Sequence, residues 1–499
     1  MSASQPPGRP RSSQTKIVAT LGPASSEEGQ LADLLSAGVD VFRINTAHGD
    51  RSEHQGRLDA VRRVAAEAGR PVAVLVDLAG PKIRLGELPD GQLMCDAGDR
   101  LRFVRLPTSR SETKPSERAR ADGGDEDLRE LTTTYEPLVD ELAVGDRVML
   151  ADGTVSFVVE EVGDGYAECR VVQPGLLRSR QGVNLPGVKL SAAALGPKDR
   201  ENALWAAEQD IDFVGLSFVR TAEEVRQLKS LLLSHNAQTQ VVAKIEKPEA
   251  LDHLQEIVEA ADAVMVARGD LGVEIDIARV AVVQKEIIAA CRRWRKPVII
   301  ATQMLDSMQH SRLPTRAEVT DVANAILDGA DACMLSGETA IGNYPLQAVE
   351  MMHRIALATE PLCRSYAPPS SEDPTVENAN QITEATVYAA GALAEQLEAA
   401  MMVVASASGA TALSVAKNRN SVPTVGISDS QSTLRRMCLY WGVHPLAGAP
   451  TGDHHALLRY VTEWGRNVGL LDPRDRVVLV AGTGLAVTAH NMIVVHELE

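Results

Sequence analysis

The sequence predicts an α/β protein: a (β/α)8 barrel carries an inserted small β-barrel lid domain and is followed by a C-terminal α/β domain. Three observations support this. Eight short apolar runs alternate with longer segments whose apolar residues recur every three or four positions. The alternation is interrupted once, after the third run, by short strand patterns bounded by Gly and Asp. Near the end of the chain, strand-then-glycine patterns resume.

The eight runs are apolar throughout and do not alternate with polar residues. Parallel strands that are buried on both faces have this pattern. Eight strand–helix units predict a closed barrel, which we place at residues 15–86 and 188–362. The runs cover residues 16–23, 39–49, 71–84, 212–220, 241–248, 263–272, 297–304 and 332–340.

Residues 87–187 are predicted to form the inserted β domain. A very polar stretch at residues 107–131 separates its strand patterns, and we expect a mobile loop there. An insertion that follows a barrel strand lies on the face where barrel active sites are built, so it is well placed to act as a lid.

Two further segments lack the pattern of a packed domain. Residues 1–14 are rich in Ser, Pro and Arg without an apolar stretch, which predicts a disordered tail. The sequence PPSSEDPTVEN at 368–378 predicts a linker, and residues 370–499 are expected to form a C-terminal α/β regulatory domain.

Composition narrows the class of partner. The chain of 499 residues has a formal net charge of -17, which opposes binding to nucleic acid. No apolar run is long enough to span a membrane, so we expect no membrane partner. The six cysteines form no C-x-x-C pair and no zinc-site spacing, which favours free thiols in a reducing cytoplasm.

Each apolar run ends in polar residues at its C-terminal side. Barrel active sites lie on that face because the strand ends and the following loops converge there. A polar residue at any one strand end could simply mark where the strand leaves the core, but eight polar ends together favour a site. They include Thr20; Arg43, Asn45 and His48; Asp77, Lys82 and Arg84; Ser217 and Arg220; Lys244 and Glu246; Arg268 and Asp270; Thr302 and Gln303; Ser336 and Glu338.

Glu246 and Asp270 end the fifth and sixth runs, which are neighbours in the predicted barrel. Two carboxylates with open water positions suit Mg²⁺ or Mn²⁺. Lys244 lies two residues before Glu246 and so shares its strand face. With Arg43 and Arg84 nearby, this pattern predicts a cationic site for a small polyanion. Spacing alone leaves strand-end salt bridges as an equal alternative.

Several long motifs carry a more specific signal. They are TKIVATLGPAS, AKIEKPEA, VMVARGDLGVEI, KPVIIATQML, LPTRAEVTDVANAILDGADACMLSGETA and SRQGVNLPGVKL. These motifs resemble those of the pyruvate kinase family, almost continuously from Thr15 to about Pro345. The resemblance implies transfer of the phosphoryl group of phosphoenolpyruvate to ADP, which gives pyruvate and ATP.

The same resemblance implies residue roles. Lys244 would stabilise the transferring phosphoryl group, and Arg43 would hold the phosphate of the substrate. Glu246 and Asp270 would bind the divalent metal. Gly269, Asp270 and Thr302 would line the carboxylate end, with Thr302 near the water chain that protonates the enolate. Asn45, His48 and Arg84 would face the nucleotide.

The chain departs from the family pattern at a monovalent-cation site. Where the family often has serine and threonine, this chain has Ala47 and Leu78; where it has glutamate, this chain has Lys82. Two oxygen donors are lost and a fixed ammonium is gained. We therefore expect Lys82 to substitute for K⁺ and the enzyme to have no K⁺ requirement. In this interpretation Asp77 could hold the ammonium of Lys82 in place.

A second departure lies in the lid. The family usually has a lysine before GVNLPG, and this chain has Gln181 preceded by Arg180. The sequence leaves open whether Arg180 replaces the missing lysine.

The third domain contains SASGAT, which resembles a loop that binds a sugar-phosphate effector in regulated members. Its candidate residues are Ser406, Ser408, Gly409 and Thr411. The effector would be a sugar phosphate or a nucleotide, and a tight strand–helix turn is an equal alternative. The resemblance also implies a homotetramer.

Two other functions fit part of the pattern. Another metal-dependent barrel lyase or aldolase acting on pyruvate-like enolates would use the same carboxylate pair and an arginine. A catalytically idle relative could sense metabolites through the third domain, although the retained Lys244, Glu246 and Asp270 argue against it.

Overall fold

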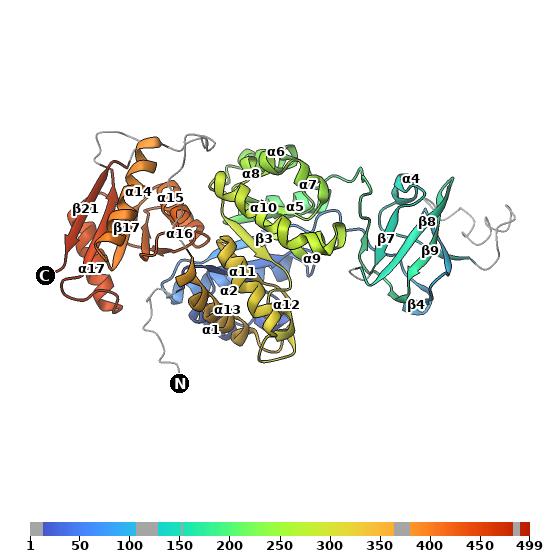
Figure 1. The fold of residues 1–499 in the computed structure, drawn as a ribbon, viewed down its shortest axis with the longest axis horizontal. Helices are drawn as coiled ribbons and strands as arrows, with labels where there is room; N and C mark the ends of the chain where they lie inside the picture. The colour runs from blue at the N-terminus through green and yellow to red at the C-terminus, as the bar shows by residue number, and fades with distance from the viewer. Residues whose placement is uncertain (1–12, 106–127, 151–152, 364–379, 483–489) are drawn as a thin grey trace.

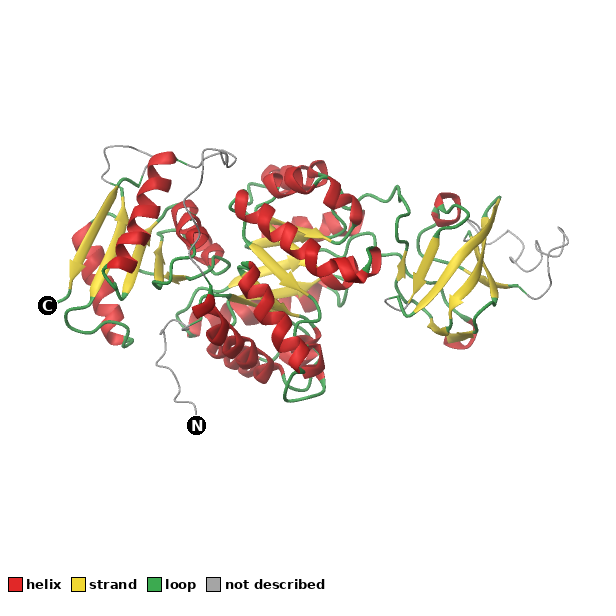
Figure 2. Cartoon of the chain, viewed as in Figure 1, coloured by secondary structure: helices red, strands yellow, loops and turns green. Residues whose placement is uncertain are grey.

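The computed structural model describes residues 13–105, 128–150, 153–363, 380–482 and 490–499. Three bodies lie in a row (Figure 1). The barrel occupies the centre, the β-rich insertion lies at one end, and the C-terminal domain lies at the other. Helices surround the central strands, whereas the insertion consists almost entirely of strands (Figure 2).

All eight predicted barrel strands are present and form a closed parallel barrel in the order β1-β16-β15-β14-β13-β12-β3-β2. The predicted fold class is confirmed. The strands are buried along almost their whole length, which explains why their sequences are continuously apolar. They are β1 (Lys16–Thr20), β2 (Val41–Asn45), β3 (Ala73–Asp77), β12 (Phe213–Leu216), β13 (Gln240–Ile245), β14 (Ala263–Ala267), β15 (Val298–Ala301) and β16 (Ala332–Leu335).

Amphipathic helices cover the outside of the barrel and bury their apolar residues against the strands. Several helices begin at side-chain caps; Asp50 caps α2, and Thr315 forms a capping box with Glu318 on α11. The long helices are α1 (Glu28–Ala37), α2 (Arg51–Glu67), α5 (Pro197–Glu208), α6 (Ala222–Ser234), α10 (Val280–Arg293), α11 (Arg316–Asp328) and α13 (Pro345–Thr359). Shorter helices are α7 (Pro248–Asp252), α8 (Leu254–Ala260), α9 (Arg268–Glu274) and α12 (Gly337–Ala340).

The N-terminal end of the barrel, its floor, carries a repeated hydrogen bond that the sequence interpretation missed. An aspartate directly precedes every second strand, and its carboxylate accepts the backbone N–H at or near the start of a neighbouring strand. These bonds, of 2.8–2.9 Å, satisfy strand-end donors that would otherwise be buried without partners. The pairs are Asp40 with Ile17, Asp212 with Val74, Asp262 with Val241 and Asp331 with Val298.

The inserted domain contains a six-stranded sheet in the order β11-β7-β8-β9-β5-β6 and a two-stranded sheet of β10 and β4. Both sheets contribute to one apolar core, which also includes Ile83, Leu85 and Val188 from the chain crossings. The elements are β4 (Gln92–Cys95), β5 (Arg100–Val104), β6 (Arg129–Leu131), α4 (Leu138–Glu141), β7 (Arg147–Leu150), β8 (Val155–Gly163), β9 (Tyr166–Gln173), β10 (Gly175–Arg178) and β11 (Val183–Asn184).

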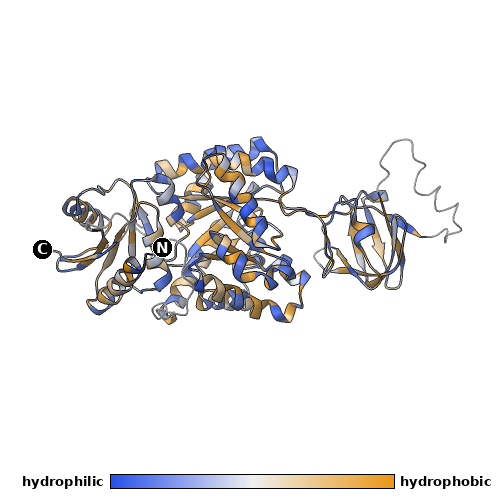
Figure 3. Cartoon of the chain, turned by 90° about the horizontal axis from the view of Figure 1, so that it is seen from above, coloured by the Kyte–Doolittle hydropathy of each residue, from blue (hydrophilic) through white to orange (hydrophobic). Residues whose placement is uncertain are grey.

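Two chain crossings connect this domain to the barrel, and they lie side by side. Arg84 and Gly182 form an antiparallel bridge, and the N–H of Leu85 donates to the carbonyl of Gln181 at 2.8 Å. The domain stands well away from the barrel beyond these crossings (Figure 3). Most of the polar stretch that we expected to be a mobile loop, residues 106–127, lies outside the described residues.

The C-terminal domain is built on a five-stranded sheet in the order β19-β18-β17-β20-β21, with only β21 antiparallel. Its strands are β17 (Met401–Ala405), β18 (Thr424–Ile427), β19 (Val443–Leu446), β20 (Arg476–Ala481) and β21 (Met492–Glu497). Its helices are α14 (Gln381–Gln396), α15 (Ala410–Asn418), α16 (Gln431–Met437) and α17 (His454–Asn467). The expected linker at 368–378 lies entirely within 364–379, outside the described residues.

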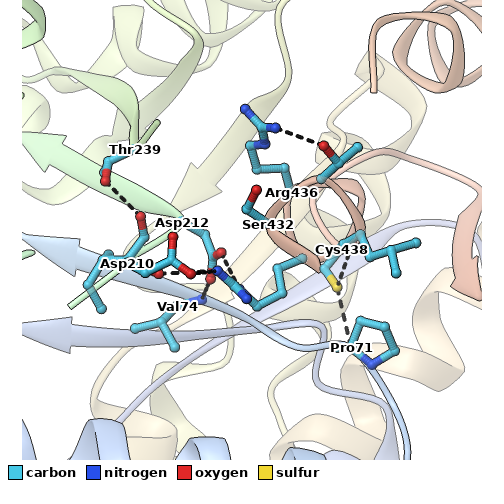
Figure 4. Close-up of polar contacts among 12 residues, drawn as sticks. Pro71, Val74, Asp210, Asp212, Thr239, Ser432, Arg436 and Cys438 are labelled. Carbon is cyan, nitrogen blue, oxygen red and sulfur yellow. Dashed lines mark hydrogen bonds and ion pairs between the residues drawn. The ribbon is translucent and has the colours of Figure 1, made fainter. Parts of the chain in front are cut away.

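This domain docks on the barrel floor through the same aspartates. Arg435 of α16 pairs with Asp212 at 2.6 Å and with Asp210 at 2.5 Å, beside Val74 (Figure 4). Asp331 receives Lys417 at 2.6 Å and Arg419 at 3.0 Å. The floor carboxylates therefore have two tasks: they complete strand ends, and they bind the C-terminal domain.

The last two residues of the predicted N-terminal tail are bonded to the rest of the protein. Residues 1–12 of the predicted tail lie outside the described residues. Ser13 and Gln14 are ordered, because the hydroxyl of Ser13 contacts His353 at 2.8 Å and the N–H of Gln14 donates to Glu360 at 2.9 Å.

All six cysteines are free thiols and five of them are buried. Among the described residues, no helix is both long and apolar enough to cross a membrane.

Candidate active site

A buried ionic cluster lies at the C-terminal ends of β2, β3 and β13. Arg43 donates to the carboxylate of Asp77 through Nε at 2.8 Å and Nη2 at 2.6 Å. Its Nη1 contacts the hydroxyl of Thr20 at 3.1 Å. Asp77 also faces the ammonium of Lys244, whose Nζ lies 3.3 Å from Oδ1. The barrel thus brings together Arg43 and Lys244, two cations separated by about two hundred positions in the chain, around one carboxylate.

Three oxygen-bearing side chains surround the ammonium of Lys244. Besides Asp77 it contacts Glu246 at 2.8 Å and donates to the hydroxyl of Ser217 at 2.7 Å. Ser217 in turn donates to the carbonyl of Leu78 at 2.7 Å. Burial lowers the pKa of Lys244, but the charges of Asp77 and Glu246 outweigh burial and raise the pKa above its ordinary value. The lysine is therefore a fixed cation.

The two carboxylates of the cluster differ in electrostatics. Burial raises the pKa of Asp77, yet Lys244 and Arg43 outweigh it and hold that pKa below its ordinary value. Burial also raises the pKa of Glu246; the charge of Asp270 adds to this effect, and Lys244 opposes it. Glu246 accepts the N–H of Phe218 at 2.8 Å, which fixes its orientation. Glu246 and Asp270 thus repel each other.

That repulsion suits a divalent cation. Asp270 is half-buried near the start of α9, which follows β14 directly, and β14 pairs with β13, the strand that Glu246 follows. No group of three or more potential His, Cys, Asp or Glu ligands is found in the described segments. Mg²⁺ is commonly held by one or two carboxylates with waters and substrate phosphates completing its shell. The carboxylates of Glu246 and Asp270 are donors of the kind that could hold Mg²⁺ or Mn²⁺.

Thr302 has an unusual backbone conformation at the end of β15. Its φ is 69°, in the left-handed region, where a β-branched residue is a clear outlier. Strain of this kind costs about 1–3 kcal/mol and concentrates at functional sites. The Thr302 hydroxyl accepts the N–H of Gly269 at 2.7 Å and donates to the carbonyl of Ala301 at 2.6 Å. The structure therefore places Thr302 against the turn that carries Gly269 and Asp270.

Comparison with known proteins decides the family. Residues 12–349 match the model of the pyruvate kinase barrel domain, and residues 384–496 match that of the pyruvate kinase alpha/beta domain. Pyruvate kinase from Geobacillus stearothermophilus is 39% identical over 489 residues, covering 97% of this chain and 80% of its own length. Pyruvate kinase 2 from Synechocystis is 40% identical, with coverages of 94% and 76%. The Mycobacterium intracellulare pyruvate kinase is 38% identical, with coverages of 97% and 98%.

The chain belongs to the pyruvate kinase family. The predicted resemblance is confirmed, and so is the expectation of an enzyme, because this family consists of phosphotransferases. The match to two family domains also agrees with the barrel and the C-terminal α/β domain described above.

In this member of the pyruvate kinase family, the predicted nucleotide residues lie on the side of the barrel nearest the insertion. His48 is exposed, and partial desolvation together with Arg84, Lys82 and Arg43 lowers its pKa below 6.5. Asn45 turns its side-chain oxygen back to the N–H of Ala47 at 3.1 Å. Arg84 donates to the carbonyl of Arg180 at 3.1 Å, so it belongs to the chain crossings as well as to the site.

The suggestion that Asp77 holds Lys82 is wrong in this structure. Asp77 is fully buried and pairs with Arg43 and Lys244, while Lys82 is exposed. The two positions where the family often has serine and threonine nevertheless offer no side-chain oxygen. Ala47 has no side-chain oxygen, and the buried side chain of Leu78 packs in the barrel core.

Arg180 and Gln181, at the position where the family usually has a lysine before GVNLPG, make local contacts. Arg180 has a φ of 63° and pairs with Glu87 at 2.6 Å on the surface. The side-chain oxygen of Gln181 accepts the N–H of Arg178 at 2.7 Å, which closes a local turn. Neither residue contacts the ionic cluster among the interactions of the described residues.

A cleft lies between the barrel end and the crossings. It is lined on one side by Lys82 and Ile83 and on the other by Phe218 and Lys247, with Val183 from the insertion. The inserted domain thus contributes one wall of a cleft that neighbours the strand ends of the barrel.

The candidate effector loop joins β17 to α15. Gly409 has a φ of 89°, and its N–H donates to the hydroxyl of Ser406 at 3.1 Å. The hydroxyl of Ser408 accepts the N–H of Ala410 at 3.4 Å, and that of Thr411 contacts His490 at 3.0 Å. The loop is therefore a well-bonded strand–helix turn.

Proposed function

We propose that this chain transfers the phosphoryl group of phosphoenolpyruvate to ADP and releases pyruvate and ATP as the glycolytic enzyme of the cytoplasm. The observation that carries the proposal is the buried Lys244, fixed as a cation among Asp77, Glu246 and Ser217 at the strand ends. A preorganised charge of this kind stabilises a transferring phosphoryl group without reorganising in the reaction.

The remaining site residues would each bind a different part of the two substrates. Arg43, already oriented by Asp77 and Thr20, would bind the phosphate of phosphoenolpyruvate. Gly269, Asp270 and Thr302 would receive the carboxylate, and Asn45, His48 and Arg84 would face ADP. A divalent cation bound by Glu246 and Asp270 would neutralise charge on the phosphoryl oxygens.

The chemical change has two parts. The bond between phosphorus and the enol oxygen breaks while a bond from phosphorus to the terminal phosphate oxygen of ADP forms. The enolate that remains then takes a proton at its methylene carbon to give pyruvate. The hydroxyl of Thr302, which accepts the N–H of Gly269, would order the water that delivers this proton.

An assay that couples pyruvate formation to lactate dehydrogenase tests the proposal directly. Turnover should require phosphoenolpyruvate, ADP and Mg²⁺ or Mn²⁺ together. Pyruvate release without ADP would instead favour a lyase or phosphatase, and absence of turnover would favour an idle relative.

We also propose that the enzyme needs no K⁺. A bound K⁺ requires several oxygen donors, since desolvating a cation without them is costly. Here Ala47 and Leu78 supply no side-chain oxygen, Asn45 is turned to a backbone N–H, and Asp77 is paired with two cations. Lys82 would supply the positive charge from the end of β3.

Assays in tetramethylammonium buffers free of K⁺, Na⁺ and NH₄⁺ test this proposal. We expect full activity there and no gain on adding KCl at constant ionic strength. Lys82→Glu should cause a severe loss that K⁺ restores only in part, because the missing oxygens remain missing. Lys285→Glu, at a lysine on α10 whose side chain is 59% exposed, is the matched control. Strong activation of the unmodified enzyme by KCl would contradict the proposal.

Regulation and assembly follow from family membership alone. We propose that the loop with Ser406, Ser408, Gly409 and Thr411 binds a sugar phosphate or a nucleotide, and that the enzyme is a homotetramer. Activation curves with each class of effector and light scattering of the purified chain test these two proposals separately.

A further inference from the structure

Arg268 connects three elements around the carboxylate end of the site without reaching the reacting groups. Its Nη2 donates to the carbonyl of Thr302 at 2.9 Å and lies 2.8 Å from the sulfur of Met304. Its Nη1 pairs with Asp321 on α11 at 2.7 Å. The side chain is only 10% exposed. A guanidinium has donors in a rigid fork, so it can hold two acceptors in one fixed relation.

The carbonyl that Arg268 holds belongs to the strained segment at the end of β15. Thr302 and the next residue, Gln303, both have positive φ, at 69° and 54°. Fixing the Thr302 carbonyl fixes the peptide plane between these two residues. It thereby sets where the Thr302 hydroxyl lies relative to Gly269, 2.7 Å away. A hydrogen bond to a charged donor is well suited to this task, because it is stronger than a neutral one.

We propose that Arg268 is a positioning residue that holds Thr302 in the conformation needed to protonate the enolate. The proposal rests on the proposed role of Thr302. Among the interactions of the described residues, Arg268 contacts none of Arg43, Lys244, Glu246 and Asp270, so it would act through the Thr302 carbonyl. Asp321 fixes the other end of the fork, so it should support the same function more weakly.

The test compares Arg268→Met, Arg268→Lys, Asp321→Asn and Thr302→Ala in the full chain. Two rates are measured: turnover with phosphoenolpyruvate and ADP, and exchange of the methyl protons of pyruvate in D₂O with Mg²⁺ and ATP. A displaced group of this kind can cost about 10²-fold in rate. We expect Arg268→Met to slow proton exchange by about 10- to 100-fold while the KM for ADP stays within about twofold. Arg226→Met, at an exposed arginine on α6, is the control for the type of substitution.

Two further results separate positioning from a merely structural ion pair. Arg268→Lys keeps a charged donor and should recover a large part of the lost exchange rate. Arg268→Met combined with Thr302→Ala should be no slower than Thr302→Ala alone, because both changes remove one function. Should Arg268→Met fail to fold, Arg268→Lys and Asp321→Asn must still slow exchange measurably; wild-type rates in both would overturn the proposal.

The outcomes distinguish this inference from the proposed function. If Thr302→Ala slows exchange but Arg268→Met exchanges like the wild type and only melts at a lower temperature, Arg268 is a structural residue and the inference is wrong. If Thr302→Ala exchanges like the wild type, the proposed role of Thr302 is wrong, and the inference fails with it. Additive losses in the double variant would also overturn the inference.

Discussion

The two ends of the barrel both carry buried aspartates paired with arginine and lysine, but the aspartates are held in different ways. On the floor, Asp212 accepts the backbone N–H of Val74 and the guanidinium of Arg435. At the other end, the carboxylate of Asp77 meets the side chains of Arg43 and Lys244. Both carboxylates are about equally buried, with at most 1% of the side chain exposed.

The difference lies in what can replace each partner. A carboxylate bonded to a strand end cannot be released without leaving a buried backbone donor unpaired, so the floor contacts are permanent. Arg43 and Lys244 can exchange side-chain contacts for the oxygens of a substrate without disturbing a strand. The same residue types therefore stabilise the fold at one end and prepare a site at the other, as in barrel enzymes generally.

The largest effect on turnover is expected from Lys244→Met, which keeps the stem of the side chain and removes its charge. Phosphoryl transfer should fall by about 10²-fold or more. Exchange of the pyruvate methyl protons should survive better, since the transferring group is absent from that step. Equal losses of transfer and exchange would show that Lys244 does not act on the phosphoryl group.

Asp270→Ala should also cripple turnover, by removing one of two protein oxygens available to the divalent cation. Binding of Mn²⁺, followed by its electron paramagnetic resonance signal, should weaken in parallel. The thermal midpoint should stay close to that of the wild type, because Asp270 lies at the functional end of the barrel. Near-normal activity at saturating Mg²⁺ would rule out the assignment.

Substitution of a floor aspartate should lower stability and leave activity nearly unchanged. Asp212→Asn keeps an acceptor for Val74 but leaves Arg435 without a buried counter-ion, and breaking such a pair costs about 3–5 kcal/mol. The thermal midpoint should fall clearly while kcat at low temperature stays within about twofold, as expected of the stability face. Asp210→Asn, whose side chain is 73% exposed, is the matched control and should have little effect. If Asp212→Asn is fully folded at the assay temperature and still loses most of its kcat, the floor also affects catalysis, and the proposed difference between the two barrel ends is wrong.

The smallest effect concerns charge at the open side of the site. Because Lys82 is one of the cations that lower the pKa of His48, Lys82→Gln should raise that pKa toward 6.5. The imidazole would then gain its proton at a higher pH than in the wild type. A titration of the His48 ring signals by NMR measures the change. An unmoved pKa would place Lys82 too far from the site to substitute for a cation.

The barrel could be predicted from the sequence because parallel strands buried on both faces are continuously apolar and end in polar residues. All eight runs became strands, and the polar ends of the second, third and fifth meet in one cluster. The partners within the cluster could not be predicted. Which of Arg43, Lys82 and Lys244 reaches Asp77 depends on side-chain directions at three separate strand ends, and Lys82 points elsewhere.

The floor had a signal that the interpretation overlooked. Asp40, Asp212, Asp262 and Asp331 each directly precede an apolar run, at every second strand. A charged residue repeated at that position indicates a shared bond to the neighbouring strand. Their cationic partners, by contrast, come from a domain far along the chain, and no local pattern reports that contact. Similarly, the strain at Thr302 follows from tertiary packing, since its sequence favours a plain strand end.

The two crossings to the inserted domain have a mechanical consequence. They form a narrow two-stranded ribbon, bridged at Arg84 and Gly182, that leaves the barrel between β3 and β12. A ribbon of this kind bends and twists more readily than it stretches, so the inserted domain can swing while its point of attachment stays put. β3 ends at Asp77, Ser217 directly follows β12, and both residues contact Lys244. Torque from the swinging domain would thus reach the barrel at the pair of strand ends that position the lysine.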